Sequence, residues 1–203
     1  MSAHREPLSV AQRLDRFGLA DRESTLKKLY VKEGAETRIS PDDPKFEERI
    51  SVLKPRSAND LKRWLGIPSG AIGQKEPARA HKAGFIPTAE RSPFAPHPEL
   101  PIEDDEARED LLAYVLSNSI PKKPTEAEKQ FVSRLNDVVR QHKIAISVFL
   151  ASDIHVEEGA TLILNKKLNV LFGNHIIVED GAKIIMESPF PQIDCGRLRY
   201  VRS

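Results

Sequence analysis

Three charged or acid–base side chains occupy one equivalent position of a repeated stretch near the C-terminus: Asp153, His175 and Arg197. A carboxylate beside an imidazole can orient the ring for general acid–base catalysis. The same side chains can instead form a charge ladder between neighbouring strands, which needs no substrate. Because no nucleophile or oxyanion donor can be placed beside them, we assign no catalytic residue.

Four carboxylates form a second candidate site: Glu157, Glu158, Glu179 and Asp180. If the two pairs stack in neighbouring turns, their oxygens lie within roughly 5–8 Å of one another, and Ca²⁺ prefers oxygen ligands of this kind. However, Arg202 falls where it can offset the charge of Asp180, and residues in turns are usually solvated. The sequence therefore leaves a cation open at this corner, and we assign no metal and no cofactor.

The composition excludes several classes of protein. The 203 residues include 31 basic and 30 acidic ones, so the net charge of +1 draws the chain neither to nucleic acid nor to an anionic membrane. Cys195 is the single cysteine, which rules out an intrachain disulfide framework and a multi-cysteine zinc site. We see no signal peptide and no apolar stretch of the roughly 18–20 residues that span a bilayer, and we expect a soluble, cytoplasmic protein.

The C-terminal quarter contains an internal repeat. Residues 154–164 read IHVEEGATLIL and residues 176–186 read IIVEDGAKIIM, 22 residues later, and the two copies agree in polarity. Apolar residues recur at every second position, which indicates strands. A period in the low twenties is typical of one coil of a parallel β-solenoid, in which three short strands stack on those of the next coil.

Gly159 and Gly181 stand at the centre of the two copies, where a tight corner requires a positive φ that glycine adopts without steric cost. A third, partial copy ends at Leu198 and Tyr200. Over roughly residues 144–202 the chain resembles the right-handed parallel β-helix class. The resemblance implies stacked parallel strands whose side chains point alternately into the core and out of it.

The segments before the repeat have helical patterns. In the first of them, Leu26, Leu29 and Tyr30 recur at helical spacing before Gly34. We predict four segments: a short-helix arm over residues 1–74, a proline-rich linker over 75–103, a two-helix segment that caps the solenoid over 104–143, and the solenoid itself over 144–203. The predicted fold class is therefore α+β: a helical N-terminal part, then a short C-terminal parallel β-solenoid with 22-residue coils.

Apolar residues on the predicted outer faces indicate assembly. Strict alternation points Phe149 and Leu171 outward, along with several isoleucines, and an outward apolar ladder needs a cover. The partial third copy also leaves its last strand without a partner, which is a template for pairing with another chain. The predicted interface residues are Leu198, Tyr200, Ile163, Ile177 and Ile185.

We therefore expect a non-enzymatic structural or interaction protein that forms a homo-oligomer or binds a protein partner, with its N-terminal arm docked on itself or on that partner. The alternative is a β-helix enzyme or a polysaccharide-binding protein that uses the outer face around Asp153, His175 and Arg197. Sugar binding commonly uses exposed Trp or Tyr residues, and the predicted outer faces lack them. We favour the non-enzymatic interpretation.

Overall fold

The structure is a computed structural model that describes residues 8–65, 102–116, 125–188 and 191–202. Its described residues divide into two compact units, a strand unit within Met1–Leu53 and Ile146–Ser203 and a helix unit within Lys54–Ala145. No helix in the described ranges is both long and apolar enough to cross a membrane.

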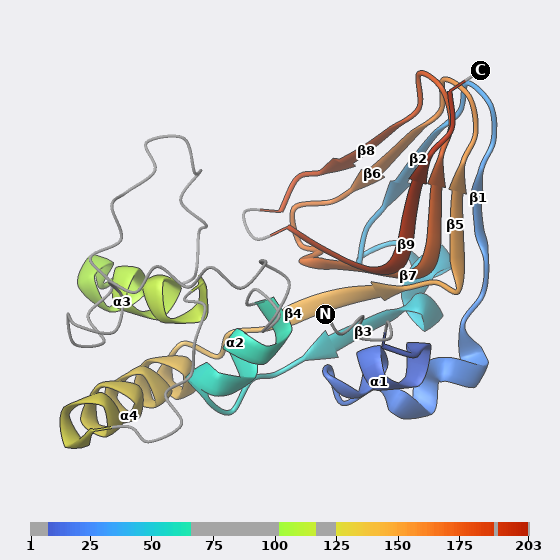
Figure 1. Cartoon of the computed structure of the whole chain (residues 1–203). Helices are drawn as coiled ribbons and strands as arrows, with labels where there is room; N and C mark the ends of the chain where they lie inside the picture. Colours follow the sequence, from blue (N-terminus) through green and yellow to red (C-terminus); the bar gives the residue numbers. More distant parts are fainter. Residues whose placement is uncertain (1–7, 66–101, 117–124, 189–190, 203) are drawn as a thin grey trace, which may run out of the picture. The chain divides into compact units, whose positions relative to one another are not determined.

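The strand unit contains nine strands in its described part: β1 Leu29–Val31, β2 Glu36–Ile39, β3 Ile50–Leu53, β4 Ile146–Leu150, β5 Asp153–Val156, β6 Thr161–Leu164, β7 Val170–Val178, β8 Lys183–Met186 and β9 Gln192–Tyr200. One sheet has the order β1-β5-β7-β4-β3, with β9 also paired to β7, and the other has the order β2-β6-β8. Figure 1 shows that the sheets form two walls joined by tight turns, around one interior.

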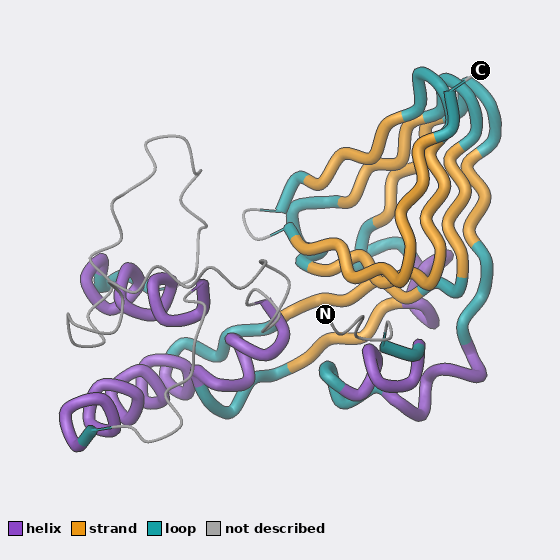
Figure 2. Tube along the Cα trace, in the orientation of Figure 1, coloured by secondary structure: helices purple, strands orange, loops and turns teal. Residues whose placement is uncertain are grey.

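The predicted parallel β-solenoid is wrong. β3 lies antiparallel to β4, with Ile50 opposite Phe149. The strands together form a curled half-barrel in which parallel and antiparallel pairs are mixed (Figure 2). Every residue of β4 is buried, so its backbone groups need partners on both sides, and β3 supplies one of them. The mixture of helices and strands itself agrees with the predicted α+β class.

The 22-residue register of the repeat is present as strand pairing within this half-barrel. Ile154 of β5 lies opposite Ile176 of β7, which in turn lies opposite Leu198 of β9. In the second wall, Leu162 of β6 lies opposite Ile184 of β8. All of these pairs are parallel. The polarity pattern of the repeat therefore predicted which residues are neighbours, although it did not predict the architecture.

A further copy of the repeat lies in the N-terminal part, where we predicted helices. Residues 29–39 read LYVKEGAETRI. They form β1, a turn and β2, which pair in parallel with β5 and β6, so that Leu29 lies opposite Ile154 and Ile39 opposite Leu164. The helix predicted from Leu26, Leu29 and Tyr30 is wrong here, because pairing with β5 outweighs the local spacing.

The central glycine of each copy has the backbone conformation that the turn requires. The φ angles of Gly34, Gly159 and Gly181 are 64°, 65° and 66°. Residues with a Cβ atom adopt these angles at a steric cost. The E-G-A or D-G-A letters thus mark the same turn three times.

The predicted outward orientation of Phe149 and Leu171 is also wrong. Both side chains are 0% exposed and belong to the main core of the half-barrel, together with Ile154 and Ile176. Strict alternation fails because the chain bends between these pairs, at Ala151 and Ser152 in the first case and at Gly173 and Asn174 in the second, and the bend resets which side chains point inward.

Two short 3₁₀ helices and one α-helix complete the strand unit: α1 Val10–Asp15, η1 Ala20–Thr25 and η2 Pro44–Arg49. Ser9 caps α1 in a reciprocal capping box with Gln12. Leu14 and Phe17, at its C-terminal side, are buried, and the Phe17 ring meets the Phe172 ring edge-on at 6.4 Å. The apolar side of this N-terminal helix thus packs on β7.

The helix unit contains α2 Ala58–Leu65, α3 Asp105–Leu116 and α4 Glu126–Gln141. Thr125 and Glu128 form a reciprocal capping box at the start of α4. Lys62 of α2 donates to the Tyr114 carbonyl of α3 at 2.7 Å, and the Ala58 N–H donates to Asn136 Oδ1 of α4 at 2.9 Å. Most of the predicted linker, residues 75–103, lies outside the described residues, and a capping role for residues 104–143 stays a prediction.

Candidate interaction surface

The inward side chains of β9 are apolar, like those of the core, but they are exposed to solvent. Leu198 and Tyr200 of β9 lie opposite Ile176 and Val178 of β7. Ile176 and Val178 are 0% and 2% exposed, whereas Leu198 and Tyr200 are 43% and 70% exposed. Apolar side chains therefore continue along the interior beyond the point where the described chain covers them.

The same change occurs at neighbouring positions. Ile193 of β9 is 41% exposed, although Leu171 beside it in β7 is fully buried. Ile184 and Met186 of β8 are half-buried at the edge of the main core. We call this surface the open end, and define it by the inward side chains of β8 and β9: Ile184, Met186, Ile193, Leu198 and Tyr200. A contiguous apolar surface of this kind is typical of a protein-binding site.

The opposite end of the interior is covered. Leu29, Val31 and Ile39, the inward residues of β1 and β2, are 7%, 0% and 0% exposed. Phe46 of η2 is buried in the same cluster, and its ring meets the Phe149 ring edge-on at 5.9 Å. We call this the capped end. The half-barrel thus has one end that the described chain closes and one that it does not.

The two strands at the open end also have free edges within the described part of the chain, since β8 pairs with β6 and β9 pairs with β7. The Lys183 N–H donates to the carbonyl of Ala160, just before β6, at 2.9 Å, and the Glu187 N–H donates to the carbonyl of Leu164, the last residue of β6, at 3.0 Å. In a strand the N–H and C=O groups of one residue point to the same side and those of the next residue to the other side, so the N–H and C=O groups of Ile184 and Met186 face away from β6. The open end therefore offers backbone hydrogen bonds as well as apolar area.

The outer face of the larger sheet brings the predicted acid–base pair together. Asp153 Oδ1 lies 2.9 Å from His175 Nδ1, and Asp153 Oδ2 lies 3.8 Å from Lys28 Nζ. Arg197 follows His175 in the next strand. The Asp153 carboxylate therefore lies between Lys28 and His175, and Arg197 lies beyond His175, all on an exposed surface. This is the geometry of the charge ladder between strands.

A second histidine lies in the next row of the same face. His155 Nε2 lies 2.6 Å from Glu179 Oε1, and the His155 ring is 6.0 Å from the ring of Tyr30 on β1. Tyr30 is 56% exposed. The expectation that the outer face lacks an exposed aromatic residue is therefore wrong. It failed because β1 was not predicted, although the letters EGA at residues 33–35 could have revealed it.

The acidic corner binds backbone groups of the turns. Glu157 Oε2 accepts the Glu33 N–H at 3.0 Å, and Glu179 Oε2 accepts the Glu158 N–H at 3.1 Å. Each carboxylate thus ties one turn to the next. Nowhere in the described ranges do three or more His, Cys, Asp or Glu side chains gather as a metal site would require.

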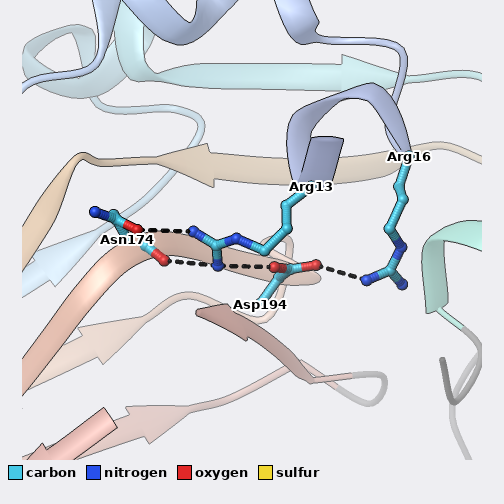
Figure 3. Close-up of polar contacts among 5 residues, drawn as sticks. Arg13, Arg16, Asn174 and Asp194 are labelled. Atoms are coloured by element: carbon cyan, nitrogen blue, oxygen red, sulfur yellow. Dashed lines mark hydrogen bonds and ion pairs between the residues drawn. The ribbon is translucent and has the colours of Figure 1, made fainter. Parts of the chain in front are cut away.

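A buried ion cluster joins α1 to β7 and β9, as Figure 3 shows. Arg13 Nη1 donates to Asp194 Oδ1 and to the Gly173 carbonyl, both at 3.1 Å, while Nη2 donates to Asn174 Oδ1 at 3.4 Å. Arg16 Nη1 donates to Asp194 Oδ2 at 3.0 Å. Asp194 therefore holds two arginines of the N-terminal helix on the last strand. We name Arg13, Arg16 and Asp194 the arginine clasp.

The clasp is buried deeply enough to affect titration. Arg13 and Asp194 are 5% and 6% exposed. Burial raises the pKa of Asp194 above its ordinary value, and the charges of Arg16 and Arg13 act in the opposite direction. Burial also raises the pKa of the Cys195 thiol, which disfavours the reactive thiolate form. The cluster therefore fixes the helix in place and does not resemble an activated nucleophile.

The predicted interface residues differ in their exposure. Leu198 and Tyr200 are exposed at the open end, and Ile185 on the outer face of β8 is 42% exposed. Ile163 is buried on the outer face of β6, and Ile177 is half-buried on the outer face of β7. Ile163 and Ile177 are thus poorly placed for an interface. The clasp was missed altogether, because 181 residues separate Arg13 from Asp194.

Comparison with known proteins gives no match for this chain among protein-family models, curated proteins or solved structures.

Proposed function

We propose that the chain is a non-enzymatic assembly protein that binds another protein chain through its open end. One observation carries the proposal: Tyr200 is 70% exposed at a position whose partner in the previous strand, Val178, is 2% exposed. Full burial of one large apolar side chain stabilises a protein by about 1.5–3 kcal/mol. A surface that only had to meet water would carry polar residues there.

The free edges of β8 and β9 support the same function. A strand edge with unpaired backbone groups is a template for a strand from another chain, and proteins usually cover it or blunt it. At the capped end of this half-barrel, η2 covers the interior. At the open end, the described residues supply neither a helix nor a further strand over Leu198 and Tyr200. A partner chain would satisfy both the apolar area and the edge.

Two matched substitutions test this proposal. Tyr200→Lys places a charge at the open end, and Tyr30→Lys makes the same change at an exposed tyrosine of the same sheet, beside the capped end. The tagged chain in extracts of its host should elute well above the monomer mass. Tyr200→Lys should lower that mass and Tyr30→Lys should not. A monomer mass for the unchanged chain, or equal effects of the two substitutions, would refute the proposal.

The outer face supports a second candidate, binding of a polysaccharide, because Tyr30 and His155 form an exposed ring pair in the row next to Asp153 and His175. Exposed aromatic side chains with polar neighbours can stack on sugar rings. Affinity electrophoresis through gels that contain polysaccharides tests it. Retardation that Tyr30→Ala abolishes would support this candidate, and equal mobility of both proteins in every gel would exclude it.

A further inference from the structure

We propose that the partner at the open end is a second copy of this chain, and that the two β8 strands pair in an antiparallel arrangement about a two-fold axis at Ile185. This inference rests on the proposed function and specifies its partner. It joins the two smaller sheets into one continuous sheet, with the strand order β2-β6-β8-β8-β6-β2.

The residues of β8 are self-complementary in this register. Residues 183–187 read KIIME. An antiparallel two-fold at Ile185 places Ile184 opposite Met186 of the second copy, and Lys183 opposite Glu187 of the second copy. Each apolar inward side chain therefore meets another apolar one, and each outer charge meets its opposite. Both kinds of cross-strand pair are favourable.

The direction of the backbone groups agrees with this register. The N–H and C=O groups of Ile184 and Met186 face away from β6, so these residues can form the hydrogen-bonded pairs of an antiparallel ladder. The N–H and C=O groups of Ile185 face β6, so Ile185 forms a non-hydrogen-bonded pair with Ile185 of the second copy. Such pairs bring the Cα atoms to about 4.5 Å. A shift by one residue would oppose peptide groups that β6 already uses.

The charges on the outer face lie within reach of the same contact. Arg38 of β2 holds both carboxylate oxygens of Glu187, at 2.7 and 2.8 Å, so this carboxylate points across β6 and has to turn toward the free edge of β8 to meet the second copy. Lys183 is exposed on the same face, and its ammonium group has no described partner within its own chain. On a monomer such a lysine blunts the strand edge. In the two-fold pair it meets a carboxylate.

The other free edge is unsuited to the same symmetry. A two-fold pairing of β9 at Arg199 would place Arg199 opposite itself, and a pairing at Leu198 would place Arg197 opposite Arg199. Both arginines are exposed on the outer face, and like charges directly opposite each other destabilise a strand pair.

The difference between the two ends of the half-barrel also favours a two-fold. Repeated head-to-tail stacking needs two different complementary surfaces. The capped end offers the backbone edges of β1 and β2 but no exposed apolar surface, because Phe46 and the inward residues of β1 and β2 are buried there. Self-association through one open end must be isologous, and it closes at a dimer.

Cysteine cross-linking tests the register directly, in the purified full chain with Cys195→Ser as the background. Ile185→Cys should form a disulfide-linked dimer under mild oxidation, because the two sulfur-bearing residues face each other. Lys183→Cys is the matched control on the same strand: its two copies lie about 13 Å apart in this register, and a disulfide needs Cα atoms within about 7 Å. Arg199→Cys tests the competing β9 pairing.

A charge reversal provides a second test that needs no cysteine. Lys183→Glu places a carboxylate opposite Glu187 of the second copy at each of the two symmetric positions. This repulsion should raise the dissociation constant of the dimer, measured by sedimentation, about tenfold or more. Lys32→Glu makes the same change in charge near the capped end and should leave the dissociation constant unchanged. Circular dichroism should match the unchanged protein in both cases.

The possible results separate this inference from the proposed function. Cross-linking of Ile185→Cys without cross-linking of Lys183→Cys or Arg199→Cys supports the β8 pair. A disulfide dimer of Arg199→Cys alone overturns it, as does a purified protein that stays monomeric at high micromolar concentration. If the protein is then still part of a larger particle in extracts, the open end binds a different protein, and only the second-copy inference has failed.

Discussion

Removing the central carboxylate of the arginine clasp should destabilise the strand unit strongly. Asp194→Ala leaves Arg13 buried, with its remaining hydrogen bonds directed to Gly173 and Asn174, which are uncharged. The side chains of Arg13 and Asp194 are 6% and 4% exposed, so water cannot replace the lost partner without local opening. Breaking a buried ion pair by removing one member typically costs about 3–5 kcal/mol. We expect a loss in this range.

Urea unfolding followed by circular dichroism measures this loss. With a denaturant slope of about 2 kcal/mol per M, the midpoint should fall by about 2 M. Glu48→Ala is the control, because it breaks the Lys27–Glu48 pair, whose side chains are 67% and 85% exposed. Its effect should stay within about 0.5 kcal/mol.

A double substitution separates a buried charge from general damage to the helix. Arg13→Met with Asp194→Ala removes the unpaired charge and keeps apolar contact with β7, so it should be more stable than Asp194→Ala alone. If Asp194→Ala costs no more than Glu48→Ala, or if the double substitution is the less stable one, the clasp does not hold the N-terminal helix as described.

Three further predictions concern titration and the turns. Burial raises the pKa of Asp194, so the folded state binds the carboxyl proton more tightly than the unfolded state does. The free energy of unfolding of the unchanged protein, relative to that of Asp194→Asn, should therefore fall as the pH rises through the folded-state pKa. A rise in this difference would mean that the charges of the arginines outweigh burial. Burial lowers the pKa of Lys62 to about 8 from 10.5, so between these pH values the side chain is protonated in the unfolded state and neutral in the folded state. The free energy of unfolding of the helix unit, relative to that of Lys62→Met, should therefore rise from pH 8 to pH 10. An unchanged difference in urea unfolding would contradict this. Gly159→Ala should cost about 1–2 kcal/mol, because φ is 65° and no neighbouring atom lies within 4 Å of the added Cβ, so only backbone strain acts; an unchanged urea midpoint would show that the turn relaxes.

Some of this fold could be predicted from the sequence. The polarity of the repeat gave the neighbours Ile154 and Ile176 correctly, because inward side chains of parallel strands meet at matched positions. The turns at Gly159 and Gly181 were recognisable because few residues tolerate their φ.

The rest depends on contacts that no local pattern contains. The copy at residues 29–39 carries polar residues at several positions where the other copies have apolar ones, so its helical spacing dominated the prediction. Phe149 was assigned to the wrong face because a bend in the chain resets the alternation. The contact of Arg13 with Asp194 depends on the final position of a helix on a distant strand.

Part of the candidate surface was predictable. Leu198 and Tyr200 were recognised because they occupy the apolar positions of the repeat that Ile176 and Val178 hold in the previous copy. Ile163 was predicted to be available, but the Arg38–Glu187 pair spans its face of the sheet, and it is buried. The capped end depends on Phe46 of η2, and no local sequence pattern indicates what so short a helix covers.

Amide hydrogen exchange measured at several protein concentrations tests the central claim most directly. The N–H groups of Ile184 and Met186 face away from β6 at the open end, and the N–H group of Tyr30 faces away from β5 at the edge formed by β1. We predict that exchange at Ile184 and Met186 slows as the concentration rises from nanomolar to high micromolar, while exchange at Tyr30 does not change. Equally fast exchange at Ile184 and Met186 at every concentration would contradict the assignment of the open end as an assembly surface.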